Sequence, residues 1–241
     1  MLSTCIIIPV YNNPKTIKKV VKESMLLDMF VIVIDDGSDV DVSPMLDDNP
    51  NLLILRHKKN RGKGSAILTG VTEAKKRGFE YVVSIDGDGQ HYPKEVKKLL
   101  PLLRDEVIVI GARKFEDNVP NASKFGRQFS NFWIWAESGK WLNDTQSGFR
   151  AYPISILDLK LTQSRYDLEI EVLTKHLWSG RAIKEVEIEV YYPPKGTRIS
   201  HFDKVKDNIR LSKIHSRLFF LNILRGVASR PKKGKFKIWS R

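Results

Sequence analysis

Short apolar runs alternate with amphipathic segments through the first half of the chain, and this alternation limits the folds that the chain can adopt. The runs are rich in Val and Ile, whereas the segments between them repeat apolar residues at helical spacing. Continuous apolar strands separated by amphipathic helices are typical of a mostly parallel sheet with helices on both faces. We therefore expect one α/β domain, with strands at Thr4–Val10, Phe30–Ile34, Leu52–Leu55, Tyr81–Ile85 and Val107–Ile110.

The second half of the chain has a different pattern. We expect, in order, an aromatic helix (125–136), a polar loop (144–150), a helix (166–178), a half-exposed strand (186–190) and a helix at about 203–224. The strand is expected because Val186, Ile188 and Val190 alternate with glutamates. An aromatic stripe at helical spacing is most simply part of the core.

Basic residues are concentrated at the C-terminal end. Of the formal net charge of +13, residues 193–241 carry +12, from 14 Lys and Arg against 2 Asp and Glu, whereas residues 1–192 are almost balanced. We therefore divide the chain into an α/β domain at 1–200 and a basic amphipathic helix and tail at 201–241. Such a module suits contact with nucleic acid, anionic lipid or a phosphorylated substrate.

Polar clusters follow three of the predicted strands. Tyr11-Asn12-Asn13 comes after the first strand, Asp35-Asp36-Gly37-Ser38 after the second, and Asp86-Gly87-Asp88 after the fourth. Ligands of open α/β sheets bind outside the carboxyl ends of the strands. The three clusters together therefore predict a binding site at that edge.

Asp86 and Asp88 form the most informative of these clusters. The glycine between them allows a tight turn, and two carboxylates at one place repel each other unless a cation lies between them. One or two carboxylates together with substrate phosphates are the usual ligands of protein-bound Mg²⁺ or Mn²⁺. The alternative is a hairpin turn, which Asp-Gly also favours, but Pro93 and a predicted helix follow instead of a strand.

Two other groups have structural as well as functional interpretations. Asp35 and Asp36 suit either a helix cap or hydrogen bonds to a nucleotide base or ribose. Lys63 belongs to the charged run 56–63, most of which is expected to be a solvated surface. Its place at the start of a predicted helix also suits phosphate binding.

Five motifs occur in an order and spacing typical of one family. They are Pro9-Val10-Tyr11-Asn12, Ile34-Asp35-Asp36-Gly37-Ser38, Asn60-Arg61-Gly62-Lys63-Gly64, Asp86-Gly87-Asp88-Gly89-Gln90-His91 and Asp144-Thr145-Gln146-Ser147-Gly148-Phe149-Arg150. Over about residues 3–200 the chain resembles a family-two glycosyltransferase of the A-type nucleotide-diphospho-sugar fold, a Rossmann-like sheet. Within that family it looks most like the dolichyl-phosphate or polyprenyl-phosphate sugar synthases.

The resemblance implies a UDP- or GDP-sugar donor, an inverting transfer, Mg²⁺ or Mn²⁺ as cofactor, and a polyprenyl-phosphate or glycan acceptor. It assigns the donor to Pro9, Tyr11, Asn13, Asp35, Asp36, Lys63, Asp86, Gly87, Asp88 and Arg113, and the metal to Asp86, Asp88 and Gln90. It assigns the acceptor or its phosphate to Arg127, Gln146, Ser147, Lys195 and Arg198, the last two in a basic flap. Asn13 departs from the glutamate that many lipid-phosphate synthases have there.

Asp144 and Asp88 are the expected catalytic residues. An inverting transfer to a hydroxyl needs a carboxylate to take the proton, and Asp144 is the candidate. A lipid phosphate is already ionised near neutral pH, and with that acceptor Asp144 would instead orient the sugar or help to hold the metal.

Two alternatives remain at the level of sequence. A nucleotidyltransferase of similar fold would normally have a glycine-rich basic segment after the first strand, where this chain has Tyr11-Asn12-Asn13. A nucleic-acid-binding module would use the basic C-terminus, but it would leave the acidic strand ends unexplained, so nucleic acid is not expected as a partner.

Association with membranes is expected to be peripheral. We see no signal peptide and no stretch of about 20 apolar residues, and a lone cysteine, Cys5, fits a reducing compartment. We therefore expect a cytoplasmic protein, at the inner face of the cytoplasmic membrane. The C-terminal helix either lies on an anionic membrane or packs on the domain. The apolar residues that would make either contact are Leu218, Phe219, Phe220, Leu221, Ile223 and Leu224. The basic residues that would face anionic lipid are Arg217, Arg225, Lys232, Lys233, Lys235 and Lys237.

Overall fold

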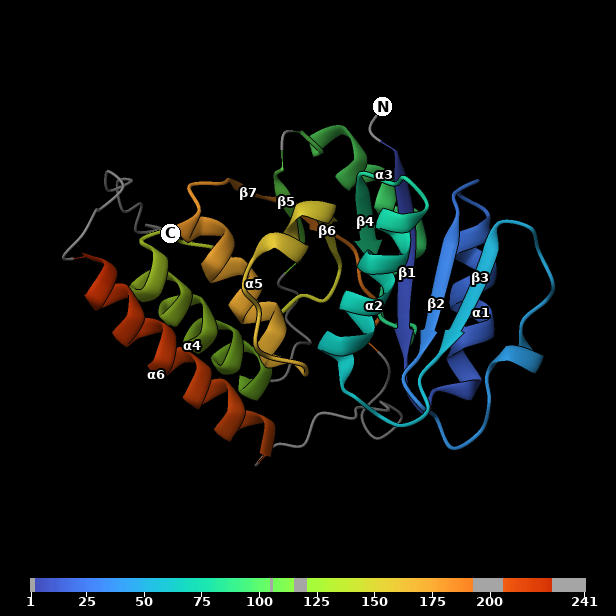
Figure 1. The fold of residues 1–241 in the computed structure, drawn as a ribbon, viewed down its shortest axis with the longest axis horizontal. Coiled ribbons are helices and arrows are strands. Elements are labelled where there is room, and N and C mark those ends of the chain that lie inside the picture. The colour runs from blue at the N-terminus through green and yellow to red at the C-terminus, as the bar shows by residue number, and fades with distance from the viewer. Residues whose placement is uncertain (1–2, 105, 115–120, 193–205, 227–241) are drawn as a thin grey trace.

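Seven strands form one sheet in the computed structural model, which describes residues 3–104, 106–114, 121–192 and 206–226 (Figure 1). The strands are β1 (Thr4–Val10), β2 (Val31–Asp35), β3 (Leu52–Arg56), β4 (Tyr81–Ser84), β5 (Ile108–Arg113), β6 (Arg150–Pro153) and β7 (Ile183–Ile188). They lie in the order β3-β2-β1-β4-β6-β5-β7. Only β6 is antiparallel to its neighbours within this sheet, so the expected mostly parallel α/β architecture is confirmed.

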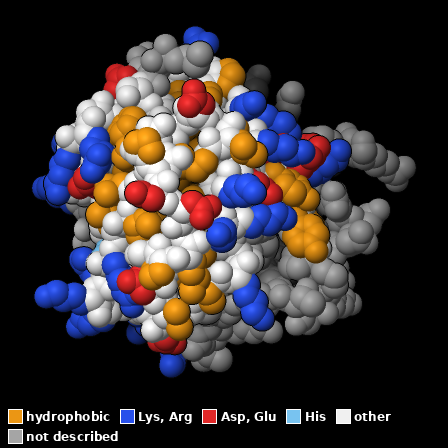
Figure 2. All heavy atoms as spheres, turned by 90° about the vertical axis from the view of Figure 1, so that its right-hand side faces the viewer, with side chains coloured by type: hydrophobic (Ala, Val, Ile, Leu, Met, Phe, Trp, Pro, Cys, Tyr) orange, Lys and Arg blue, Asp and Glu red, His pale blue; other side chains and the backbone are white. Residues whose placement is uncertain are grey.

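The helices cover both faces of the sheet. Helix α1 (Pro14–Met25) and the short α3 (Val96–Leu99) pack on one face. The other face is covered by α2 (Lys63–Lys76), α4 (Asn121–Ser138), α5 (Asp167–Trp178) and α6 (Lys206–Gly226). Because both faces are covered, every side chain of β2 is buried. The edge strand β3 is only half-buried, and acidic, basic and apolar side chains are interspersed on this side of the molecule (Figure 2).

Three local expectations differ from the structure. Strand β6 was not predicted, because its four residues follow a polar loop and form no apolar run. The helix expected after Pro93 is a single α-helical turn between two 3₁₀ turns. The aromatic stripe of α4 is not simply part of the core, because Phe129 is 43% exposed and Phe132 is 48% exposed.

Helix α6 packs against α4 and α5 through a buried polar cluster as well as apolar contacts. His215 Nδ1 lies 2.6 Å from Glu137 Oε1, and Thr174 donates a hydrogen bond to Glu137 Oε2 at 2.9 Å. Ile214 and Leu218 of α6 belong to the same apolar core as α2 and α5. The inner side of α6 is therefore part of the fold, while the proposed division at residue 200 stays a prediction. None of the described helices is long and apolar enough to cross a membrane.

Candidate functional site

The strand-end clusters meet at one edge of the sheet, as parallel pairing requires. Val10 is in register with Asp35, and the Gly87 amide donates to the Pro9 carbonyl at 3.3 Å. Helix α1 contributes to the same edge, because Thr16 Oγ1 donates to the Gly87 carbonyl at 2.6 Å. A Cβ at Gly87 would lie 3.1 Å from that of Val10, so the turn fits closely against β1.

Asp86 is paired with a lysine from the start of α2. Lys63 Nζ lies 2.7 Å from Asp86 Oδ1 and 3.2 Å from Oε2 of Glu169 in α5. Burial disfavours all these charges, but mutual attraction outweighs it, so the pKa of Lys63 is raised and that of Asp86 lowered. Both groups are therefore charged at neutral pH. Glu169 was not predicted, because nothing in its helical context distinguishes it from a core-flanking glutamate.

Gly148 packs directly against the Lys63–Asp86 pair. A Cβ at this position would lie 2.5 Å from Asp86 Oδ2 and 2.5 Å from Lys63 Nζ. The loop that follows Asp144 is therefore in close contact with the acidic turn. Three segments that are remote in sequence, around residues 63, 86 and 148, converge on one point.

Asp88 lies at the partly exposed tip of the turn. The Gln90 amide donates to Asp88 Oδ1 at 3.0 Å, and Gln90 Nε2 donates to Oδ2 at 2.8 Å. Gln90 thus orients the carboxylate in this structure. Gly89 adopts a φ of +76°, a left-handed conformation that glycine allows in the turn.

Asp35 and Asp36 are buried and hold loops in place. Asp36 accepts the amides of Arg61 at 2.9 Å and Gly62 at 2.7 Å, and His57 Nδ1 lies 2.7 Å from Oδ1. Asp35 accepts the Ser38 amide at 2.9 Å. The geometry favours the structural interpretation of Asp36, which fixes the loop leading to Lys63.

The segment after β1 is tied to the segment after β2. Asn12 adopts a φ of 50°, and its side chain exchanges two hydrogen bonds with Asp39, of 2.9 and 3.0 Å. Pro9 is buried and Tyr11 is half-buried. Asn13 is also buried, and its Oδ1 has no hydrogen-bond partner among the described residues. The residues expected to bind the nucleoside thus lie together, and the side-chain oxygen Oδ1 of Asn13 is unsatisfied among the described residues.

Asp144 is enclosed by two arginines. Arg113 donates from Nε to Oδ2 at 2.7 Å, from Nη2 to Oδ1 at 2.8 Å, and from its amide to Oδ2 at 3.1 Å. Arg127 Nε lies 3.4 Å from Oδ1. Burial opposes ionisation of Asp144, but Arg113 outweighs it and lowers the pKa of the carboxyl. A buried, doubly hydrogen-bonded carboxylate of low pKa is a poor proton acceptor.

The loop around Asp144 is held by two further side chains, to which the sequence analysis gave no role in the site. Glu185 of β7 accepts the amides of Asn143 and Asp144, at 2.8 and 3.0 Å. Arg150, fully buried, donates to the carbonyls of Ser147 and Thr145 at 2.6 and 2.8 Å. The alternation of glutamates with Val186 and Ile188 predicts a half-exposed strand but no role for Glu185 in the site, because its contacts depend on the pairing of β7 with β5.

The remaining predicted site residues differ in accessibility. Ser147 is buried and donates to the Gly111 carbonyl at 2.6 Å, so it stabilises the loop. Gln146 is exposed and donates to the Gly126 carbonyl at 3.2 Å. Lys195 and Arg198 lie outside the described residues.

The donor atoms at the turn suit a hard divalent ion that completes its coordination elsewhere. No group of three His, Cys, Asp or Glu side chains that would form an all-protein cage occurs in the described part of the chain. Asp86 and Asp88 supply carboxylate oxygens, and Mg²⁺-type ions commonly take one or two of these together with substrate phosphates and water. Lys63 engages Asp86, and Gln90 engages both oxygens of Asp88.

Comparisons with known proteins identify the family of the chain. The model of the family described as glycosyl transferase family 2 matches residues 5–165. The chain is 29% identical to UDP-N-acetylglucosamine--dolichyl-phosphate N-acetylglucosaminyltransferase of Methanococcus voltae, over 78% of this chain and 85% of that protein. It is 26% identical to polyprenol monophosphomannose synthase of Mycolicibacterium smegmatis, over 77% and 76% of the two chains.

A solved structure shares the fold. Glucosyl-3-phosphoglycerate synthase from Mycobacterium tuberculosis, in complex with Mn²⁺, UDP and phosphoglyceric acid, matches with a TM-score of 0.64 at 19% identity. The match covers 95% of this chain and 80% of that one.

Proposed function

The chain belongs to glycosyl transferase family 2, and from that premise we propose that it moves a sugar from a UDP- or GDP-sugar to polyprenyl phosphate. The observation that most supports a phosphate acceptor concerns the Asp144 carboxylate. Both of its oxygens accept hydrogen bonds from Arg113. A hydroxyl acceptor needs a free base, whereas a phosphate monoester is already an anionic nucleophile. The names of the two relatives described above, a dolichyl-phosphate and a polyprenol enzyme, support the same class of acceptor.

The arginines favour an anionic acceptor on electrostatic grounds. Arg113 and Arg127 together carry two positive charges against the single charge of Asp144. The cluster is therefore net positive, and guanidinium groups recognise phosphate well. In this proposal Asp144 is a positioning residue that holds both arginines.

The reaction needs no proton transfer. A phosphate oxygen of the acceptor forms a bond to the anomeric carbon, while the bond from that carbon to the diphosphate oxygen breaks and its electron pair leaves with the nucleoside diphosphate. Attack opposite the leaving group inverts the configuration. Lys63, charged and beside Asp86, is placed to attract the diphosphate.

We propose that Asp88, with Asp86 and Gln90, would hold Mg²⁺ or Mn²⁺. When bound, the ion would stabilise negative charge on the leaving diphosphate. Mn²⁺ and UDP in the solved structure of the same fold support this proposal. Because polyprenyl phosphate is a membrane lipid, we expect the enzyme at the inner face of the cytoplasmic membrane, with no nucleic acid as partner.

The test is transfer of labelled sugar from UDP-N-acetylglucosamine, UDP-glucose and GDP-mannose, with Mn²⁺ or with a chelator. Acceptors are polyprenyl phosphate and, as the matched control, the same polyprenol without phosphate. We expect labelled lipid only with the phosphate and only with metal. Transfer to the free polyprenol or to a glycan, with none to the phosphate, would overturn the proposed acceptor.

A further inference from the structure

Helices α4 and α6 lie side by side on the side of the molecule away from β3 (Figure 1). Aromatic side chains of the two helices contact each other there. Ring contacts run continuously between the helices: Phe132–Trp133 at 5.8 Å, Trp133–Phe219 at 5.8 Å and Phe219–Phe220 at 6.2 Å between centroids. Phe129 touches Trp133 as well, at 6.1 Å. We call this surface the α4–α6 face; it consists of Phe129, Phe132, Trp133, Phe219, Phe220 and Ile223.

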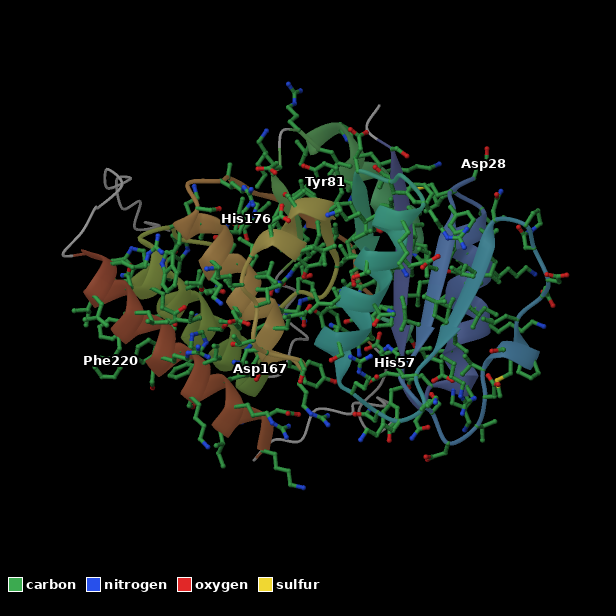
Figure 3. The ribbon with its side chains drawn as sticks, in the orientation of Figure 1. Asp28, His57, Tyr81, Asp167, His176 and Phe220 are labelled. Atoms are coloured by element: carbon green, nitrogen blue, oxygen red, sulfur yellow. The ribbon has the colours of Figure 1, made fainter. Side chains whose placement is uncertain are left out.

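Much of the α4–α6 face is open to solvent. Phe132 is 48% exposed, Phe220 is 65% exposed and Ile223 is 50% exposed. Phe220 lies on the outer side of α6, at the end of the molecule (Figure 3). Contiguous apolar surface of this kind is uncommon on proteins that work alone in water and marks an interaction site.

The charges beside this face have one sign. The exposed charged side chains of α6 are all basic. Lys206 and Lys213 lie on its first half, whereas Arg217 donates to Thr162 Oγ1 and Arg225 donates to the Trp178 carbonyl of α5. The one acid of α6, Asp207, is buried and paired with Arg210, and the one acid of α4, Glu137, is buried against His215. An apolar face with basic surroundings complements an anionic lipid surface. A second copy of the chain would bring like charges together.

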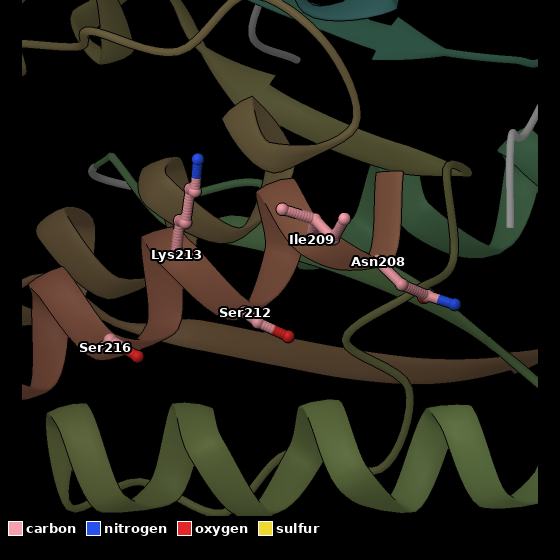
Figure 4. Close-up of a pocket in the computed structure, with 5 residues that line it drawn as sticks. All are labelled: Asn208, Ile209, Ser212, Lys213 and Ser216. Carbon is pink, nitrogen blue, oxygen red and sulfur yellow. The ribbon is translucent and has the colours of Figure 1, made fainter. Parts of the chain in front are cut away.

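A hollow of about 440 Å³ opens along the first half of α6, beside the face (Figure 4). It is lined by Asn208, Ile209, Ser212, Lys213 and Ser216. The ammonium, hydroxyl and amide groups of this lining are donors for a phosphate head group, while Ile209 supplies an apolar wall. The hollow thus continues the same combination of apolar and basic groups.

The α4–α6 face is adjacent to the candidate site along helix α4. Arg127, which approaches Asp144, lies in α4 just before Phe129, and Gln146 donates to the Gly126 carbonyl at 3.2 Å. A surface lying against Phe129 and Phe132 would therefore be next to the arginine cluster.

From these observations we propose that the α4–α6 face docks the enzyme on an anionic bilayer, with Phe132 and Phe220 inserted among the lipids. This inference extends the proposed function, since an acceptor in the bilayer would then meet Arg113 and Arg127 without leaving the membrane surface. Vesicle binding needs neither donor nor turnover, so the two proposals fail separately.

The experiment is sedimentation of the full chain with vesicles at about 0.15 M salt, where long-range electrostatic attraction is screened. One set of vesicles is phosphatidylcholine alone and the other is equal parts phosphatidylcholine and phosphatidylglycerol. The test variant is Phe132→Ser/Phe220→Ser. The matched control is Leu26→Ser, which removes an apolar side chain that is 79% exposed at the end of α1.

We expect the wild type and Leu26→Ser to bind the anionic vesicles. The affinity of Phe132→Ser/Phe220→Ser for these vesicles should be lower by about tenfold or more. Thermal melts should show that both variants fold. Equal binding by the double variant, or equal binding of the wild type to neutral vesicles, would overturn the proposal. A wild-type dimer in light scattering that the double variant abolishes, with no vesicle binding, would assign the face to a second copy instead.

Discussion

The ammonium nitrogen of Lys63 lies 2.7 Å from a carboxylate oxygen of Asp86. The first acid of the turn therefore has a counter-ion from the first residue of α2. The two aspartates have different partners. Asp86 is paired with Lys63, whereas Asp88, at the partly exposed tip of the turn, accepts hydrogen bonds from Gln90. The predictions below depend on this division.

Asp88→Asn is expected to lower kcat/KM by about a hundredfold or more, because it removes the carboxylate proposed to hold the metal near the leaving diphosphate. Stabilisation of the protein by UDP with Mn²⁺ in a thermal melt should also disappear. The matched control is Asp39→Asn, another exposed aspartate of the same edge, which pairs with Asn12. If Asp88→Asn binds and turns over like wild type, the metal proposal is wrong.

Gly148→Ala is expected to displace the Lys63–Asp86 pair, since the added Cβ would lie 2.5 Å from Lys63 Nζ and from Asp86 Oδ2. We expect donor affinity to fall at least tenfold, as for the loss of one charge-assisted contact. Gly226→Ala is the control, because a Cβ there meets nothing within 4 Å. Titration with UDP-sugar decides the result, and unchanged affinity in Gly148→Ala would contradict the close packing.

Asp144→Asn separates a base from a positioning residue. Removing the charge takes the Asp144 carboxylate away from Arg113 and Arg127, which should cost about 3 kcal/mol of stability and raise KM for polyprenyl phosphate. The pH profile of kcat should keep its shape. A loss of kcat at unchanged KM would instead identify Asp144 as the base.

The lowered pKa of Asp144 also predicts that the folded protein loses stability at low pH. A carboxyl whose pKa is lower in the folded state stabilises the fold above its unfolded pKa and loses that contribution as pH falls through the folded pKa. The ordinary value is 3.8. Unfolding by denaturant should therefore become easier below about pH 4, and Asp144→Asn should show a smaller dependence in this range.

His176 predicts a second pH dependence at higher pH. Burial lowers its pKa from 6.5 to about 4, so the unfolded chain binds a proton between these values while the folded chain does not. Stability should thus fall as pH decreases from 6.5 towards 4. His176→Gln should reduce this slope in thermal melts at several pH values, and His91, whose pKa burial also lowers to about 4, should supply the remainder. The same slope in the variant would rule out His176 as the source.

Much of the sheet could be predicted because buried parallel strands are continuous apolar runs. Because β1, β2 and β4 are parallel, their carboxyl ends were expected at one edge of the sheet. The acidic turn after β4 lies at that edge. Strand β6 could not be predicted in this way. Its pairing between β4 and β5 depends on long-range contacts, and Arg150, its first residue, is polar although fully buried.

Side-chain roles within the site were harder to predict than its location. Asp36 was expected to contact the nucleoside, but its oxygens accept the amides of Arg61 and Gly62. Glu169 reaches Lys63 from α5, a helix far along the chain. Sequence patterns report which edge a residue occupies, whereas a buried carboxylate is assigned by the donors that surround it in space.

The reversed direction of β6 has a practical consequence for labelling the protein. Pro153 at the end of β6 pairs with Tyr81 at the start of β4, so the chain leaves β6 at the edge of the sheet opposite the site. The last residue of the turn that follows (Ile154–Asp158) is exposed, so Asp158 offers a place to attach a fluorophore. A probe there would report on the whole molecule from the edge remote from Asp88, without entering the space where donor and acceptor are expected to meet.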